Sequence, residues 1–218
     1  MPAPVLIVDD HELVGTSLLI SLRHEGLDAH LVCGGVDTVL AAAGRLALGL
    51  VLLDLDLGRD ANGRPVDGIR LVPPLSSAGW TVIILSGSSD HARIGSALDA
   101  GAAAWVSKNA PFPALLAAVR AAQEGRPAMA DDRRERLVAL SRQRGVEQAE
   151  LNGKLAKLSQ REREVLAQLA QGRRAQAVAD HFVVSLATVR TQIRAVLTKL
   201  EVTSQLEAAA LYRRATGR

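Results

Sequence analysis

The sequence predicts an α/β domain with a doubly wound, five-stranded parallel sheet, followed by an all-helical domain. Five short apolar runs alternate with helical periodicity over residues 1–124, as in strand–helix repeats. Residues 155–218 carry helical periodicity, which favours a helical bundle. Charge divides similarly: residues 1–124 hold 8 Lys and Arg against 13 Asp and Glu, whereas residues 125–218 hold 18 against 10. An acidic half joined to a basic half suggests a control domain attached to a binder of polyanions.

The predicted elements of the first domain follow one another along the chain. Each strand is a short apolar run, and each helix is a longer segment with apolar residues at helical spacing. Strands are predicted at residues 5–9, 27–32, 50–54, 81–85 and 104–107. Helices are predicted at about residues 11–24, 36–45, 68–77, 90–100 and 112–124. Pro73-Pro74 is expected to end the third helix early.

Polar side chains stand where four of these strands end. Asp9-Asp10 follow the first strand, Asp54 ends the third, Ser86 the fourth and Lys108 the fifth. The carboxyl ends of the strands form one crevice in such a sheet, so these groups are expected to converge. Clustered carboxylates repel one another and favour a hard divalent cation such as Mg²⁺. A carboxylate beside Mg²⁺ and an ammonium group can accept a phosphoryl group as an acyl phosphate.

This constellation resembles the receiver domain of NarL/FixJ-type two-component response regulators, a flavodoxin-like fold, and the resemblance covers residues 4–124. By this resemblance Asp54 is the phosphoacceptor. The metal would be Mg²⁺, held directly by Asp10, by Asp54 and by the Asp56 backbone carbonyl, with Asp9 helping through water.

The resemblance assigns three further residues to the switch. Ser86 reports the phosphoryl group by hydrogen bonding to it, and Lys108 pairs with its charge. Trp105, three residues before Lys108, holds the place of the aromatic switch residue. The phosphodonor implied for such a domain is a sensor histidine kinase.

The segment after the expected phosphoacceptor departs from the family pattern. A Leu-Gly step replaces the usual Met-Pro, and the usual Asp-Gly comes only at Asp67-Gly68, after an insertion of about six residues. Gly and Pro predict a loop over residues 59–66 rather than a longer helix. This loop could cover the crevice, supply Arg59 or Arg64 to a phosphoryl group, impede a kinase, or be an inert surface feature.

Residues 158–211 predict three helices in the order of a helix-turn-helix, with a further helix after them. Ser159 is placed to cap the first helix, with Glu162 as its capping-box partner, and Gly172 is typical of its end. Ser185 follows a tight turn and caps the third helix, whose outward face is polar and cationic. A helix of this kind after a turn is what a major-groove reader needs.

This segment resembles, without a gap, the DNA-binding domain of LuxR-type regulators, with family hallmarks at residues 161–166, 188–190 and 199–200. The resemblance implies double-stranded DNA as a partner and a homodimer on paired half-sites. Ala177 and Leu186 depart from the usual residues; the first is expected to loosen helix packing and the second to alter the entry to the recognition helix. The candidate DNA-binding residues are Thr188, Arg190, Thr191, Arg194 and Lys199.

Other features of the sequence narrow the class of protein. Only five aromatic residues occur, so stacking on single-stranded nucleic acid is a poor prospect. The lone Cys33 rules out an intrachain disulfide. The sequence has neither a basic leader segment nor an apolar run long enough to cross a bilayer, so we expect a cytoplasmic protein without membrane contact.

The predicted domain organisation is a receiver domain at residues 1–124, a helical linker at 125–154 and a helix-turn-helix domain at 155–218. The linker carries leucines at helical spacing around Gly145 and Gly153. It therefore predicts one or two amphipathic helices, which are too short to indicate a coiled coil.

Three functions are open to this sequence. The leading hypothesis is a transcription regulator, not an enzyme, that is switched by Mg²⁺-dependent phosphorylation of Asp54. The second is an atypical receiver that controls DNA binding without phosphorylation, because of the inserted residues. The third is an aspartyl-phosphate hydrolase, since Asp54-Leu55-Asp56 resembles the Asp-x-Asp motif of haloacid-dehalogenase-type phosphatases, with Asp56 as general acid.

Overall fold

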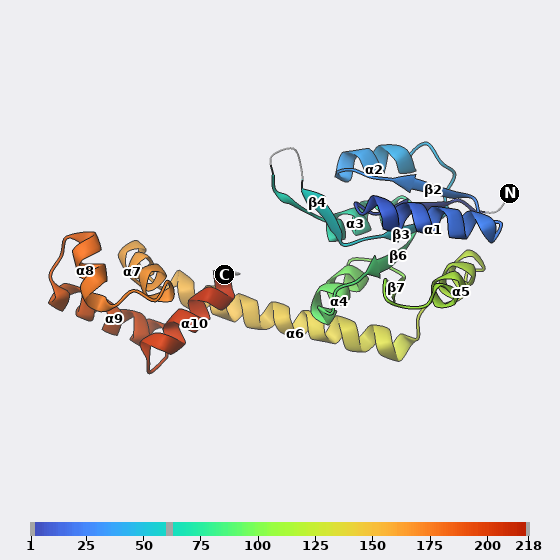
Figure 1. Ribbon diagram of the computed structural model, residues 1–218. Helices are drawn as coiled ribbons and strands as arrows, with labels where there is room; N and C mark the ends of the chain where they lie inside the picture. The colour runs from blue at the N-terminus through green and yellow to red at the C-terminus, as the bar shows by residue number, and fades with distance from the viewer. Residues whose placement is uncertain (1–2, 60–62, 217–218) are drawn as a thin grey trace. The chain divides into compact units, whose positions relative to one another are not determined.

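The computed structural model describes residues 3–59 and 63–216, and the chain divides into two compact units, Met1–Arg142 and Gln143–Arg218. The first unit contains a parallel sheet with helices, and the described part of the second unit is helical (Figure 1). No helix in the described ranges is both long enough and apolar enough to span a bilayer.

The first unit is built on a five-stranded sheet in the order β2-β1-β3-β6-β7, with every neighbouring pair parallel. All residues of β1 and β3 are buried, because these strands lie inside the sheet. The doubly wound parallel sheet predicted from the apolar runs is confirmed. The strands are β1 (Val5–Val8), β2 (Ala29–Val32), β3 (Leu50–Leu53), β6 (Thr81–Ser86) and β7 (Ala104–Ser107).

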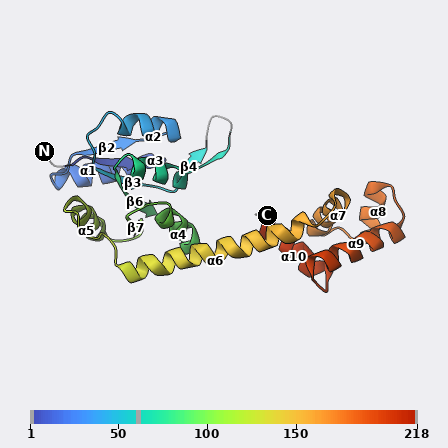
Figure 2. The same cartoon turned by 180° about the vertical axis from the view of Figure 1, so that it is seen from behind.

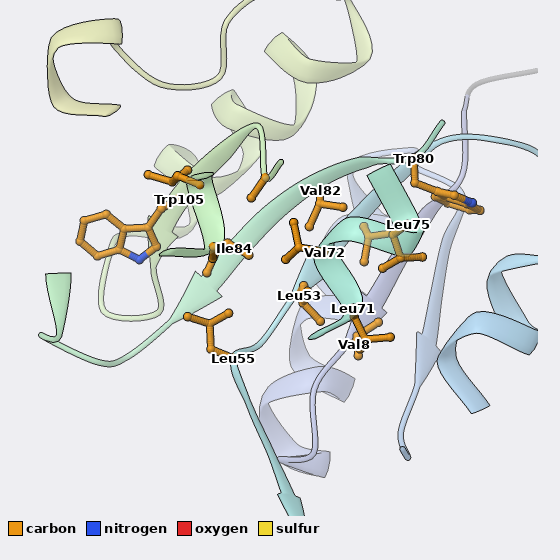
Figure 3. Close-up of a cluster of buried hydrophobic side chains, with 14 of the residues drawn as sticks. Val8, Leu53, Leu55, Leu71, Val72, Leu75, Trp80, Val82, Ile84 and Trp105 are labelled. Atoms are coloured by element: carbon orange, nitrogen blue, oxygen red, sulfur yellow. The ribbon is translucent and has the colours of Figure 1, made fainter. Parts of the chain in front are cut away.

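Helices cover both faces of this sheet. Leu6 and Val8 of β1 belong to an apolar cluster with side chains of α2, α3 and α4, which Figure 3 shows in part. Val5 and Ile7 point to the other face and join side chains of α1 and α5. The helices are α1 (Glu12–His24), α2 (Val36–Ala43), α3 (Val72–Ser77), α4 (His91–Asp99) and α5 (Phe112–Gln123).

The third helical segment differs from its prediction. A 3₁₀ helix, η1 (Gly68–Leu71), leads directly into α3, and Pro73 and Pro74 lie in the first turn of α3. The expectation that these prolines end the helix is therefore wrong. A proline fits the first turn because its missing N–H would have no acceptor inside the helix.

The inserted segment forms a hairpin whose ends are strands. Asp56 pairs with Asp67 at the base of this antiparallel hairpin. Leu57 is buried in the first apolar cluster, and Val66 packs against that cluster. The predicted loop is thus wrong at its ends, because these two apolar side chains anchor both arms; residues 60–62 lie outside the described ranges. The strands are β4 (Asp56–Arg59) and β5 (Pro65–Asp67).

One helix, α6 (Asp131–Ala156), makes up most of the predicted linker. Gly145 and Gly153 lie inside it without interrupting it, and Figure 2 shows the helix unbroken. In the first unit, Leu137 of α6 is buried in the cluster that α2, α3 and α4 share. A single helix thus occupies most of the segment for which the sequence predicted one or two.

The second unit contains the predicted helix-turn-helix. Ser159 and Glu162 form the capping box, and Gly172 follows the first helix with a φ of 82°. Ser185 caps the helix after the turn by accepting from the Thr188 N–H at 3.1 Å. The helices are α7 (Gln160–Ala170), α8 (Ala175–Phe182), α9 (Leu186–Leu200) and α10 (Gln205–Thr216).

Candidate functional sites

The acidic residues predicted to meet at the strand ends do meet. Asp9 follows β1 and Asp54 follows β3, and both are almost fully buried, with 2% and 3% of their surfaces exposed. Asp10 is exposed beside them. Ligand-type atoms of these three residues and of His11 lie within 4.8 Å of one another. Oxygen atoms at this spacing are a donor set that suits a hard cation such as Mg²⁺.

Lys108, from the end of β7, lies inside this cluster. Its Nζ is 2.6 Å from Asp9 Oδ2 and 2.7 Å from Asp54 Oδ2. Burial lowers the pKa of the Lys108 ammonium, but its hydrogen bonds to Asp54 and Asp9 outweigh burial and raise that pKa. For Asp54, burial raises the pKa of the carboxyl group more than Lys108 lowers it. Lys108 is thus the main cation that opposes carboxylate repulsion in the site.

The two residues predicted to sense the site are both buried. Ser86 ends β6 without any exposed surface, and its hydroxyl accepts from the Ser88 N–H at 3.1 Å. Trp105 in β7 is 7% exposed. The Arg133 guanidinium of α6 lies 4.6 Å from the centre of the indole ring, and the His91 ring meets it edge-on at 5.7 Å. The aromatic residue is therefore covered by the linker helix.

Two glycines, Gly58 in the hairpin and Gly68 at the start of η1, allow the backbone to approach the acidic cluster closely. At Gly68, an added Cβ would lie 2.2 Å from the Asp54 carbonyl oxygen. At Gly58, whose φ is 67°, a Cβ would lie 2.8 Å from Asp10 Oδ2. No structural role was predicted for these two glycines from the sequence, and only the structure shows that they make room beside the site.

In the second unit, α9 presents the cationic face predicted for it. Arg190, Thr191 and Arg194 are exposed, and the opposite side of the helix is buried. Thr188 is also exposed, but its hydroxyl lies 2.8 Å from that of Ser185 in the helix cap. The buried side consists of Val189, Ile193, Val196 and Leu200.

Two known protein families match this chain, one over each part of it. Residues 5–120 match the family model described as "Response regulator receiver domain", which is more than half of the chain. Residues 156–212 match "Bacterial regulatory proteins, luxR family". The chain is a response regulator of the NarL/FixJ type.

The response regulator matches curated relatives over nearly its whole length. It is 31% identical to the nitrate/nitrite response regulator protein NarP of Escherichia coli, over 97% of this chain and 94% of that protein. It is 26% identical to the transcriptional regulatory protein LiaR of Bacillus subtilis, over 94% of each. The two-domain order is therefore shared with proteins that regulate transcription.

Solved structures of two response regulators resemble the whole chain. ChrA, from a heme-sensing two-component system, is 28% identical and aligns with a TM-score of 0.50 over 99% of both chains. RcsB of Salmonella enterica serovar Typhimurium, bound to the promoter rprA in the presence of the phosphomimetic BeF3-, aligns with a TM-score of 0.52 over 98% of this chain and 99% of that chain. At 24% identity, the second likeness shows the fold alone.

Lys199 of this response regulator does not face outward as predicted. Its Nζ donates to both carboxylate oxygens of Glu162, at 2.9 and 2.7 Å. Lys199 lies on a different side of α9 from Arg190 and Arg194, because residues nine and five apart in a helix do not share one face. The ion pair joins α9 to the capping box of α7 instead.

Both departures from the LuxR-type pattern leave the fold intact. Ala177 is exposed on α8, so the expectation that it loosens helix packing is wrong. Leu186 is the first residue of α9 and is partly buried, while the cap formed by Ser185 is present. The entry to α9 is therefore an ordinary capped N-terminus.

One of the two arginines proposed from the sequence to reach the site, Arg59, is bonded elsewhere. Arg59 donates to the Gly63 carbonyl at 2.6 Å, within its own hairpin. Arg93 in α4 does contact the surroundings of Asp54, and its guanidinium binds the Asp56 carboxylate at 2.6 Å. Sequence reasoning missed Arg93, and no local motif marks it.

Proposed function

We propose that this response regulator binds DNA under the control of phosphoryl transfer from a sensor histidine kinase to Asp54. The observation that carries the proposal is the buried Asp54 carboxylate with the Lys108 Nζ 2.7 Å away and Asp9 and Asp10 beside it. Such a site combines a nucleophilic oxygen with the charges that phosphoryl transfer needs. A chromosomal DNA partner would place its action in the cytoplasm.

The proposed chemistry is one displacement at phosphorus. An oxygen of Asp54 forms a bond to phosphorus as the bond to the kinase histidine nitrogen breaks, and that nitrogen keeps the electron pair and takes up a proton. Lys108, already on Asp54, can move to the new phosphoryl oxygens. Asp10, Asp54 and the Asp56 carbonyl would hold Mg²⁺, with Asp9 acting through water. The ion would neutralise charge on the phosphoryl group.

Ser86 and Trp105 are proposed to carry the signal away from the site. Ser86 would donate its hydroxyl hydrogen to the phosphoryl group; the oxygen of the same hydroxyl accepts from the Ser88 N–H. Trp105 is packed under Arg133 of α6, so a shift of the indole would be felt by the linker helix.

The proposed partner of α9 is the major groove of double-stranded DNA. Arg190 and Arg194 can donate to guanine edges or phosphates, and Thr191 lies on the same exposed face. Thr188, at the start of this face, is proposed to contact the backbone of the DNA. We withdraw Lys199 from the proposed DNA contacts because Glu162 holds it. One helix reads few base pairs, so a homodimer on two half-sites is proposed.

Intact mass after incubation with Mg²⁺ and a small phosphodonor tests the proposal. One added phosphoryl group on the wild type, absent from Asp54→Asn, is the expected result, followed by a change in DNA affinity of the wild type alone. If an adduct forms at another residue, the assignment of Asp54 is wrong.

A second candidate is a receiver that controls DNA binding without phosphorylation. It is favoured by the hairpin, whose Gly58 backbone approaches the Asp10 carboxylate and could limit access to the cluster. Unmodified wild type with intact DNA binding would support it. The hydrolase alternative has less support, because Arg93 binds the Asp56 carboxylate that would have to act as general acid; it would require repeated turnover of a phosphate ester.

A further inference from the structure

Arg93 is not used by the proposed phosphorylation scheme, yet its guanidinium binds three groups beside Asp54. Its Nη1 donates to Asp56 Oδ1 at 2.6 Å. Its Nη2 donates to the Leu55 carbonyl at 2.7 Å and to Asp67 Oδ1 at 3.0 Å. One side chain from α4 thus holds both arms of the β4–β5 hairpin at their base.

These charges stabilise one another as a set. Arg93 lies in the first turn of α4, where the helix dipole disfavours a cation. Asp56 and Asp67 are paired across the hairpin, where two facing carboxylates repel. The guanidinium lies between the two carboxylates and offsets their repulsion. The two carboxylates in turn offset the unfavourable effect of the helix dipole on Arg93. Without Arg93, its guanidinium would no longer offset the repulsion between the two carboxylates at the base of the hairpin.

The peptide group between Leu55 and Asp56 connects Arg93 to the proposed phosphoacceptor. Its carbonyl oxygen accepts from Arg93 and also from the Gly68 N–H at 2.8 Å. Its N–H, on Asp56, donates to Asp54 Oδ1 at 3.3 Å. A cation on the carbonyl side polarises the peptide and makes its N–H a stronger donor. The charge of Arg93 therefore acts on the Asp54 carboxylate through a single peptide unit.

We propose that Arg93 is a positioning residue for the phosphorylation of Asp54, acting through the Leu55–Asp56 peptide and not on the phosphoryl group. This inference rests on the proposed function. Arg93 keeps the Asp56 N–H against one oxygen of Asp54 and so orients the carboxylate. It also holds the Asp56 backbone, whose carbonyl is a proposed Mg²⁺ ligand. The same contacts tie this orientation to the first turn of α4.

The test compares full-length wild type with Arg93→Ala and Arg93→Lys. Arg70→Ala is the matched control, since it removes an exposed arginine from the neighbouring helix η1. Three quantities are measured: amide hydrogen exchange at Asp56 by NMR, an NMR titration with Mg²⁺ alone, and phosphoryl uptake from acetyl phosphate by intact mass. The first two require no phosphorylation.

In Arg93→Ala we expect exchange at the Asp56 amide to rise about ten-fold and uptake to slow about ten-fold, the factor typical of losing one charge-assisted hydrogen bond. Arg93→Lys should restore part of both effects, because it keeps the charge but cannot make all three contacts. Arg70→Ala should match the wild type in all three measurements.

Unchanged exchange at Asp56 in Arg93→Ala would overturn the inference. Faster exchange with wild-type uptake and wild-type Mg²⁺ affinity would overturn it as well. If the wild type takes up no phosphoryl group, the proposed function fails separately, and the Mg²⁺ titration decides: weaker binding by Arg93→Ala supports the inference, and equal binding overturns it. If Arg93→Ala does not fold, Arg93→Lys carries the test, where a partial loss supports the inference and no loss overturns it.

Discussion

At the scale of single residues, Val183 combines a β-branched side chain with a left-handed backbone in the turn before α9. Its φ is 54° and its ψ 49°, and the residue is 91% exposed, so burial does not offset the strain. We predict that Val183→Asn stabilises the second unit by about 1 kcal/mol, because Asn tolerates this conformation.

Thermal melting followed by far-UV circular dichroism measures this effect. Trp80 and Trp105 both lie in the first unit, so the melting transition seen by tryptophan fluorescence should not move. Val183→Ala keeps a Cβ in the left-handed region and should give a smaller gain. A lower melting temperature for Val183→Asn would contradict the prediction.

Glu162 gives the second unit a dependence on pH. Its hydrogen bond to Lys199, then that to the Ser159 N–H, hold the pKa of the carboxyl group below its ordinary value of 4.5, although burial opposes them. Because the pKa is lowered in the folded state, the stabilisation is present above pH 4.5 and is lost as the pH falls through the lowered pKa.

We therefore predict that Glu162→Gln is less stable than the wild type at neutral pH and that the difference disappears in acid. Urea unfolding at a series of pH values measures it. Glu164→Gln is the control. Glu164 is a partly exposed residue of the same helix whose carboxylate pairs with the nearby Arg161, so this change should alter stability little. A difference that persists unchanged in acid would show that packing, and not charge, is responsible.

At the scale of elements, α4 and α6 meet at a glycine. An added Cβ at Gly95 would lie 1.9 Å from the Leu137 carbonyl oxygen, so the two helices touch backbone to backbone. Arg134 of α6 donates to the carbonyls of Leu98 and Ala102 at 2.8 and 2.7 Å, at the end of α4. These contacts hold the first half of α6 against α4, where Arg133 lies over the Trp105 ring.

We predict that Gly95→Ala destabilises the first unit by roughly 1–3 kcal/mol, because the methyl group must push α6 away. Arg133 would then leave the indole, and the emission of Trp105 should shift. Gly145→Ala is the matched control: nothing lies within 4 Å of its Cβ position, so the same change should stabilise α6 by about 0.5–1 kcal/mol. Equal effects of the two variants would refute the close approach at Gly95.

At the scale of the whole molecule, the two proposed activities belong to different units and should be separable. Arg190→Ala is expected to weaken binding to duplex DNA selected by the wild type by about 1–3 kcal/mol and to leave phosphoryl uptake unchanged. Asp54→Asn should abolish phosphoryl uptake and leave the affinity of the unphosphorylated protein for DNA unchanged. Fluorescence anisotropy measures DNA binding and intact mass measures phosphoryl uptake for both variants. Arg126→Ala in the first unit is the control. Unchanged DNA binding by Arg190→Ala would remove it from the reading face.

The sequence by itself was enough for the features that depend on neighbours along the chain. Short apolar runs such as residues 50–53 are typical of strands that are buried on both faces, and their alternation with helical segments predicts the parallel sheet. Asp54 and Lys108 were predictable because each ends a strand, and parallel strands bring such ends to one edge. The capping box at Ser159 is a local pattern and was read directly.

Tertiary structure alone decided the features that join residues far apart in the chain. Arg93 binds Asp56 and Asp67, and Lys199 binds Glu162. Gly95 allows the Leu137 backbone to approach closely. None of these pairs shares a local motif. The local sequence around a charged residue or a helical glycine is the same whether or not a distant residue contacts it in the folded chain. Its role depends on which surface the fold places opposite, and that is fixed by packing and charge across the folded chain.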